Sequence, residues 1–173
     1  MRAFIRLLAG FALFAGLISA AGCQREEEKG PFVLSGRIFV FNYRVARATY
    51  VVTLARKAPL PGEGVIETSF ENPAGGAPLV TRTKVSPAAT GVALESPAVH
   101  CIVKGRPYTV TIRVLGADDK PIQTIETSVT SSLDQTVLPA KPLVVGPLYT
   151  PNPEVFPGDG TADYSPDATC PKA

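Results

Sequence analysis

Few residues of this chain are of types that carry out chemistry. It holds three cysteines and one histidine. Because Cys101 and Cys170 are expected to be oxidised to each other, the chain does not offer the three or four close N, S or carboxylate ligands of a zinc site. Serine-nucleophile chemistry would need His100 beside an activated serine, and the sequence has no Gly-x-Ser-x-Gly motif. Asp159, Asp163 and Asp167 lie four residues apart and are weak candidates for Ca²⁺ ligands, but they lack the EF-hand order, and solvated turn acids are the favoured interpretation. The sequence therefore predicts neither an enzyme nor a cofactor.

Two cysteines, Cys101 and Cys170, form an even pair once Cys23 is assigned another role. In an oxidising compartment such a pair is most simply a disulfide. The alternative, a redox or metal pair, is disfavoured because the two are far apart and no Cys-x-x-Cys motif exists. The bond would close a loop of about 70 residues and stabilise the fold by about 4 kcal/mol through the entropy of the unfolded chain.

The start of the chain indicates export. Arg2 and Arg6 precede an apolar stretch over 7–22, and small residues lead into Cys23. The uncharged span up to Arg25 covers no more than about 18 residues and contains three glycines, which is short for a permanent membrane helix of about 20 apolar residues.

Residues 20–23, Ala-Ala-Gly-Cys, resemble the lipobox of bacterial lipoproteins, in which the first position is usually Leu. The resemblance implies that 1–22 is a signal peptide and that acylated Cys23 anchors the chain in the lipid bilayer. Gln24, where an Asp would favour retention in the inner membrane, indicates the outer membrane, with the protein facing the periplasm. An ordinary secretory signal and an uncleaved single-pass anchor are the alternatives.

Residues 23–31 join the anchor to the rest of the chain. After the cysteine, the sequence QREEEKGP has no apolar residue to pack and predicts a solvated tether. Its eight residues reach no more than about 29 Å, so the folded part stays close to the membrane. Removal of 1–22 leaves equal numbers of basic and acidic residues. A neutral mature chain gives no electrostatic reason to expect nucleic acid as a partner.

Residues 32–138 have the pattern of one all-β domain. Apolar and polar side chains alternate in ARATYVVTLAR (46–56) and more regularly in YTVTIRV (108–114). Turn sequences rich in Gly, Pro, Asn and Asp separate such segments. Further strands are expected at 32–42, 64–70, 79–85, 91–95, 98–104 and 121–130. Seven or eight short strands without helices predict an antiparallel two-sheet sandwich.

The segment KGRPYTVTIRVLGADDKPIQTIETSVTS (104–131) resembles the last hairpin of fibronectin type III and immunoglobulin-like domains. The resemblance implies that Tyr108 makes a tyrosine corner, in which the hydroxyl bonds to backbone a few residues upstream. An ordinary core aromatic is the alternative for Tyr108. A true immunoglobulin domain is disfavoured because the chain has no Trp and no cysteine pair at the immunoglobulin spacing.

Residues 139–173 hold eight of the 17 prolines, which excludes a helix or a central strand. The apolar run PLVVGPLY and the position of Cys170 favour an extended segment that packs along the sandwich. The disulfide would then join it to Cys101 on the strand before Tyr108. A free disordered tail is the alternative.

The function indicated by these features is that of a non-catalytic protein-binding or structural lipoprotein of the bacterial envelope, with an envelope protein as its partner. Exposed sheet edges and the apolar C-terminal segment suit strand addition or groove contacts. A small-ligand or glycan-binding lipoprotein is the alternative, although the chain has no Trp and its tyrosines are scattered.

Overall fold

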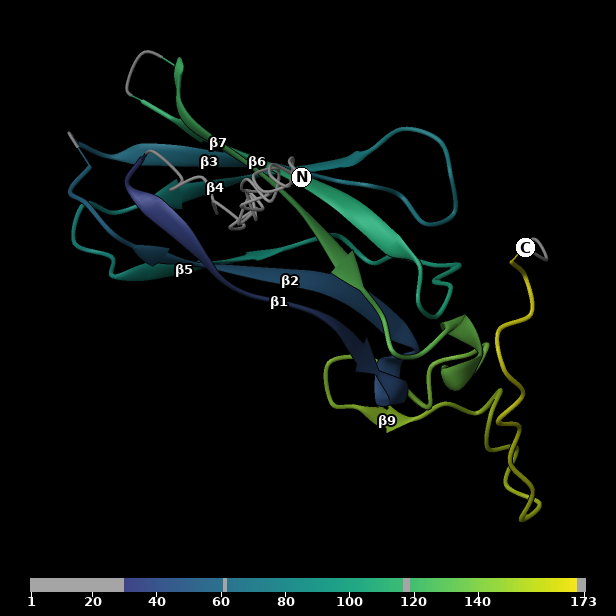
Figure 1. Ribbon diagram of the computed structural model, residues 1–173. Helices are drawn as coiled ribbons and strands as arrows, with labels where there is room; N and C mark the ends of the chain where they lie inside the picture. Colours follow the sequence, from purple (N-terminus) through teal and green to yellow (C-terminus); the bar gives the residue numbers. More distant parts are fainter. Residues whose placement is uncertain (1–29, 61, 117–118, 171–173) are drawn as a thin grey trace, which may run out of the picture.

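The computed structural model describes residues 30–60, 62–116 and 119–170, and its body is a sandwich of two antiparallel sheets (Figure 1). One sheet has the strand order β1-β2-β5 and the other the order β4-β3-β6-β7. The strands are β1 (Phe32–Asn42), β2 (Arg47–Arg56), β3 (Gly64–Phe70), β4 (Leu79–Val85), β5 (Gly91–Glu95), β6 (Pro107–Leu115) and β7 (Pro121–Thr130). The predicted all-β sandwich is confirmed.

The core lies between the two sheets because every second side chain of each strand points inward. In β2 the inward residues begin at Ala48, and in β6 they begin at Tyr108, as the alternation predicts. The buried residues of these two strands are Ala48, Tyr50, Val52, Leu54, Tyr108, Val110, Ile112 and Val114. Each large apolar side chain buried in this way contributes about 1.5–3 kcal/mol.

Aromatic rings occupy the centre of the core. The ring of Phe39 meets Tyr50 edge-on with centroids 4.4 Å apart and lies 5.6 Å from Tyr108. Both tyrosine hydroxyls are satisfied, which buried tyrosines require. The hydroxyl of Tyr50 donates to the Glu71 carbonyl at 3.0 Å, and burial raises the pKa of Tyr50 above its usual value. The hydroxyl of Tyr108 accepts the backbone N–H of Val103 at 2.7 Å, which is the geometry expected of a tyrosine corner.

A buried glutamine joins the two sheets where β1 meets β7. The side-chain amide of Gln123 donates to the Phe32 carbonyl at 2.7 Å and accepts the Phe32 N–H at 3.0 Å. Further along the same pair of strands, Arg37 donates to the Thr127 hydroxyl at 2.9 Å. These contacts link two strands that share no ladder of backbone hydrogen bonds among the described residues.

The prediction of a strand at 98–104 is wrong. Only Val99 pairs with a neighbouring strand, through an isolated bridge to Ala48. Cys101 has a positive φ of 65°, a backbone conformation that interrupts a strand. The carbonyl of Ile102 accepts the N–H of Gln135, shortly before the C-terminal segment, instead of that of a strand partner. Cys101 therefore lies in a connection before β6 and not on a strand.

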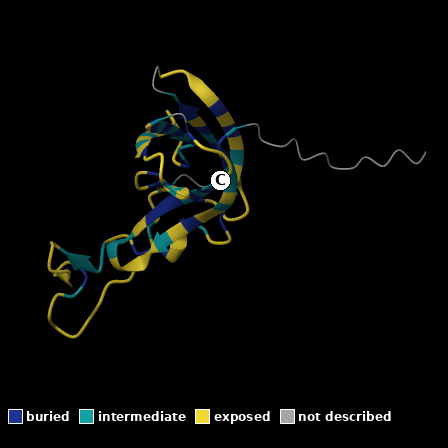
Figure 2. Cartoon of the chain, turned by 90° about the vertical axis from the view of Figure 1, so that its left-hand side faces the viewer, coloured by how far each residue is buried: buried dark blue, intermediate teal, exposed yellow. Residues whose placement is uncertain are grey.

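The described part of the C-terminal segment packs against one end of the sandwich. A short 3-10 helix, η2 (Gln135–Val137), leads into it, and it contains the two-residue strands β8 (Val144–Val145) and β9 (Thr150–Pro151). The N–H of Leu143 donates to the Arg44 carbonyl at 2.8 Å, and Val155 is fully buried. Beyond these anchors the segment is mostly exposed, as Figure 2 shows.

Candidate interaction surfaces

His100, the chain's one histidine, lies in the connection before β6 and is exposed. Its Nδ1 is 3.7 Å from Asp167 Oδ2, a separation too long for a hydrogen bond. The pair does join the connection before β6 to the C-terminal segment, but it is a surface contact.

The three aspartates considered for Ca²⁺ bind their own backbone instead of meeting one another. Asp159 accepts the N–H of Thr161 at 2.9 Å, and the same two-residue turn recurs from Asp163 to Ser165 and at Asp167. These hydrogen bonds hold the pKa of each aspartate below its usual value. Across the described ranges, no three metal-binding side chains come together. The geometry is that of turn acids.

The cysteine pairing is confirmed. Cys101 and Cys170 form a disulfide with their Cα atoms 5.1 Å apart, across 69 positions of sequence. The bond fixes the end of the C-terminal segment to the connection before β6, whereas the expected attachment was a strand. The third cysteine, Cys23, lies outside the described residues, as do the rest of the signal sequence over 1–22 and most of the tether at 23–31. Among the residues that are described, none belongs to a helix able to span a bilayer.

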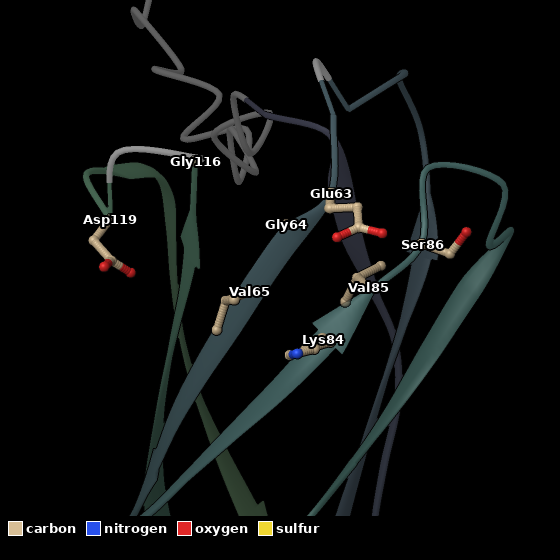
Figure 3. Close-up of a pocket in the computed structure, with 8 residues that line it drawn as sticks. All are labelled: Glu63, Gly64, Val65, Lys84, Val85, Ser86, Gly116 and Asp119. Carbon is tan, nitrogen blue, oxygen red and sulfur yellow. The ribbon is translucent and has the colours of Figure 1, made fainter.

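A shallow depression lies at the end of the four-stranded sheet (Figure 3). Its volume is about 530 Å³. Lys84 at the end of β4, Asp119 on the turn after β6 and Glu63 on the loop before β3 all line it. Its lining residues are Glu63, Gly64, Val65, Lys84, Val85, Ser86, Gly116 and Asp119. Its lining therefore combines acidic and basic side chains.

The outer face of the four-stranded sheet is ion-paired. Glu67 on β3 receives an arginine from each neighbouring strand, Arg82 on β4 at 3.3 Å and Arg113 on β6. At the opposite end of the sheet, Arg106 pairs with Glu71 at 2.6 Å. Exposed ion pairs of this kind contribute little stability, about 0–1 kcal/mol each, but they suit a face that meets water.

The outer face of the three-stranded sheet has few charged residues and exposes two large apolar side chains, Ile38 and Val40. Ile38 lies opposite Val51, and Val40 lies opposite Thr49, in two adjacent cross-strand pairs. Only two of the face's residues are charged, Arg47 and Glu95. The full set is Ser35, Gly36, Ile38, Val40, Asn42, Arg47, Thr49, Val51, Thr53, Ala55, Gly91, Ala93 and Glu95. We call this set the apolar face.

A groove of about 400 Å³ opens where the C-terminal segment meets the apolar face. Val40 and Thr49 of the sheet lie on one side and Tyr149 of the C-terminal segment on the other. The guanidinium of Arg44 stacks over the Tyr149 ring at 5.6 Å. The sequence did not predict this groove, since its two sides are about 100 residues apart. The one available signal was the run IFVF at 38–41, which is apolar at successive positions and so on both faces of the strand.

The comparisons with known proteins leave the family of this chain open. No protein-family model matches the sequence, and no curated protein is significantly similar to it. The functional conclusions below therefore depend on the residues and the geometry described above.

Proposed function

We propose that the protein is a lipid-anchored, non-catalytic module of the bacterial envelope that binds a protein partner or has a structural role. One observation carries the proposal: Cys101 and Cys170 are paired with each other, so Cys23 is left for the anchor. A disulfide is also what an oxidising compartment such as the periplasm permits. The residues around Cys23 resemble a lipobox, and Gln24 favours the outer membrane.

The fold supports this proposal through the place where the tether joins it. The tether leads into β1, whose first residue, Phe32, is held by Gln123. The β-sandwich therefore starts within about 29 Å of the acylated residue. The tyrosine-corner hydrogen bond of Tyr108 supports the resemblance to fibronectin type III domains, which serve as modules in many unrelated proteins.

Strand β4 is the edge that we propose for the protein partner. It ends the order of the four-stranded sheet, so its outer backbone groups have no ladder partner among the described residues. The β1 and β7 edges, by contrast, are joined to each other through Gln123 and Arg37. A partner strand added to β4 would also lie beside the depression at Lys84.

The experiment is site-specific photocrosslinking in intact cells. A photoreactive residue replaces Val80, which is exposed on β4, or Ser128, which is exposed on β7 and serves as the matched control. We expect one discrete protein adduct from position 80 and none from position 128. Equal adducts at both positions, or none at either, would contradict strand addition at β4. The mass of the uncrosslinked protein reports acylation separately.

A further inference from the structure

The two outer faces of this sandwich differ in chemistry, although both are formed by antiparallel sheets of similar strand length. On the four-stranded sheet, Arg82, Glu67 and Arg113 form a continuous ion-paired row. On the three-stranded sheet, the equivalent central row is Ile38, Val51 and Glu95. An antiparallel sheet that meets water on one side normally alternates apolar inward and polar outward residues. The apolar face departs from that pattern, and a contiguous exposed apolar patch indicates an interaction site.

The apolar character continues from the sheet onto the C-terminal segment. Tyr149 and Val40 line the same groove, whose lining also includes the polar residues Asn42, Arg47, Thr49 and Glu95. The adjacent Leu148 is 84% exposed. In Figure 1 the β1-β2-β5 sheet forms the lower layer, and the β8–β9 segment lies beneath one end of it. Tyr43, at the turn between β1 and β2, is also exposed near this end. The surface thus combines aliphatic side chains with tyrosines.

The basic groups near this surface lie at the same end. Arg47 belongs to the apolar face, and Arg44 lies over the Tyr149 ring. Glu95 is the one acidic residue of the apolar face. Arginine and tyrosine beside aliphatic side chains are the composition of surfaces that rest in the interface of a bilayer: the rings and guanidinium groups lie at the headgroups, and the aliphatic groups lie deeper.

The position of the tether brings this surface to the membrane. Seven residues, 24–30, separate Cys23 from Pro31, and β1 follows at once. Strand β1 is an edge strand of the same sheet that carries the apolar face. A tether of this length, no more than about 29 Å, permits the whole length of β1, about 36 Å at 3.3 Å per residue, to lie parallel to the bilayer.

We propose that the apolar face lies on the lipid bilayer, with the strands parallel to the membrane. This inference rests on the proposed lipid anchor at Cys23. Arg44 and Arg47 then meet lipid phosphates, and Ile38, Val40 and Leu148 reach the boundary between headgroups and acyl chains. The ion-paired sheet and the β4 edge face away from the membrane, where a protein partner can approach them.

The test uses the absence of tryptophan from this chain. One variant is Ile38→Trp, on the apolar face, and its matched control is Val80→Trp, on the opposite sheet. The two native side chains are almost equally exposed, at 59% and 57%. The full-length acylated variants are extracted from cell membranes and reconstituted in vesicles of phosphatidylethanolamine and phosphatidylglycerol with brominated acyl chains. Their fluorescence is compared with that in unbrominated vesicles.

If the apolar face rests about 5–10 Å deep in the interface, bromine should quench the tryptophan fluorescence of the Ile38→Trp variant at least about twofold more than that of the Val80→Trp variant. The Ile38→Trp emission also shifts to the blue on reconstitution, and that of Val80→Trp does not. Equal quenching of two acylated variants would overturn the proposal and leave the anchor intact. The indole at position 38 could instead be shielded from a soluble quencher in native membranes but not in lipid vesicles. That result would assign the face to a protein partner and would also overturn the proposal.

The mass of the same samples keeps the two proposals distinct. Acyl chains on Cys23 with unequal quenching support both the anchor and the orientation. A protein without acyl chains overturns the anchor, and the orientation that rests on it falls with the anchor. An Ile38→Asp variant adds a second readout, because it is expected to remain folded and acylated, yet to leave Tyr149 more open to a soluble quencher of tyrosine fluorescence.

Discussion

Replacement of Gln123 tests how the two sheets are held together. In Gln123→Met the side chain keeps its length but loses both hydrogen bonds to Phe32, which join β7 to β1 at 2.7 and 3.0 Å. Phe32 is fully buried and Gln123 is 5% exposed, so water does not readily replace the lost partners. A buried polar group without a partner costs about 1–3 kcal/mol. With one N–H and one C=O orphaned, the expected loss is about 2–6 kcal/mol.

The assay is urea unfolding followed by circular dichroism, on protein that lacks residues 1–22 and carries Cys23→Ser so that no anchor forms. The control is Thr124→Ala, at an exposed position next to Gln123, where the expected change is within about 0.5 kcal/mol. For a chain of this size, the loss predicted for Gln123→Met also lowers the Tm in a thermal scan by about 4–24 °C. If Gln123→Met is no less stable than Thr124→Ala, the assigned role of the glutamine is wrong.

Three further predictions concern the connection before β6, its hydrogen bonds and the C-terminal segment. Tyr108→Phe keeps the ring in the core but leaves the Val103 N–H without the hydroxyl that accepts it. The free energy of unfolding should therefore fall by about 1–3 kcal/mol. An unchanged urea midpoint would contradict the tyrosine corner. Replacement of Cys101 and Cys170 together by alanine should cost about 4 kcal/mol and expose the C-terminal segment to proteolysis, and a cleavage pattern like that of the native protein would refute the attachment. The hydrogen bond from Thr169 holds the pKa of Asp167 below its usual value. The ionised carboxylate therefore stabilises the fold above the ordinary aspartate pKa, and this stabilisation is lost as the pH falls through the lowered pKa. Asp167→Asn should accordingly flatten the acid limb of a plot of Tm against pH.

The strands were predictable from the sequence wherever one face of a strand is buried. The segment 108–114 alternates regularly because Tyr108 and its inward neighbours fill the core while threonine and arginine meet water. The segment 98–104 alternates as well, yet it forms no strand. Alternation cannot reveal the positive φ of Cys101, nor that the carbonyl of Ile102 is taken by a segment more than 30 residues later.

The surfaces were harder to predict, because they depend on which strands become neighbours. Gln123 shares the inward face of β7 with Ile125 and Val129, and a polar residue at an inward position is a signal of a buried hydrogen bond. Its partner, Phe32, is 91 positions away and gives no local sign. Likewise, the sequence marks Ile38 as part of a strand but cannot show that its side chain faces outward. The disulfide was simpler, since only two cysteines remained to pair.

The central claim is that Cys23 carries a lipid anchor and that Cys101 and Cys170 are bonded to each other. Intact mass spectrometry of protein extracted from membranes, with and without reduction and alkylation, tests both parts in one measurement. We expect the loss of residues 1–22, the added mass of acyl chains, and two alkylated thiols only after reduction. An unmodified Cys23, or two thiols that alkylate without reduction, would contradict the corresponding part of the claim.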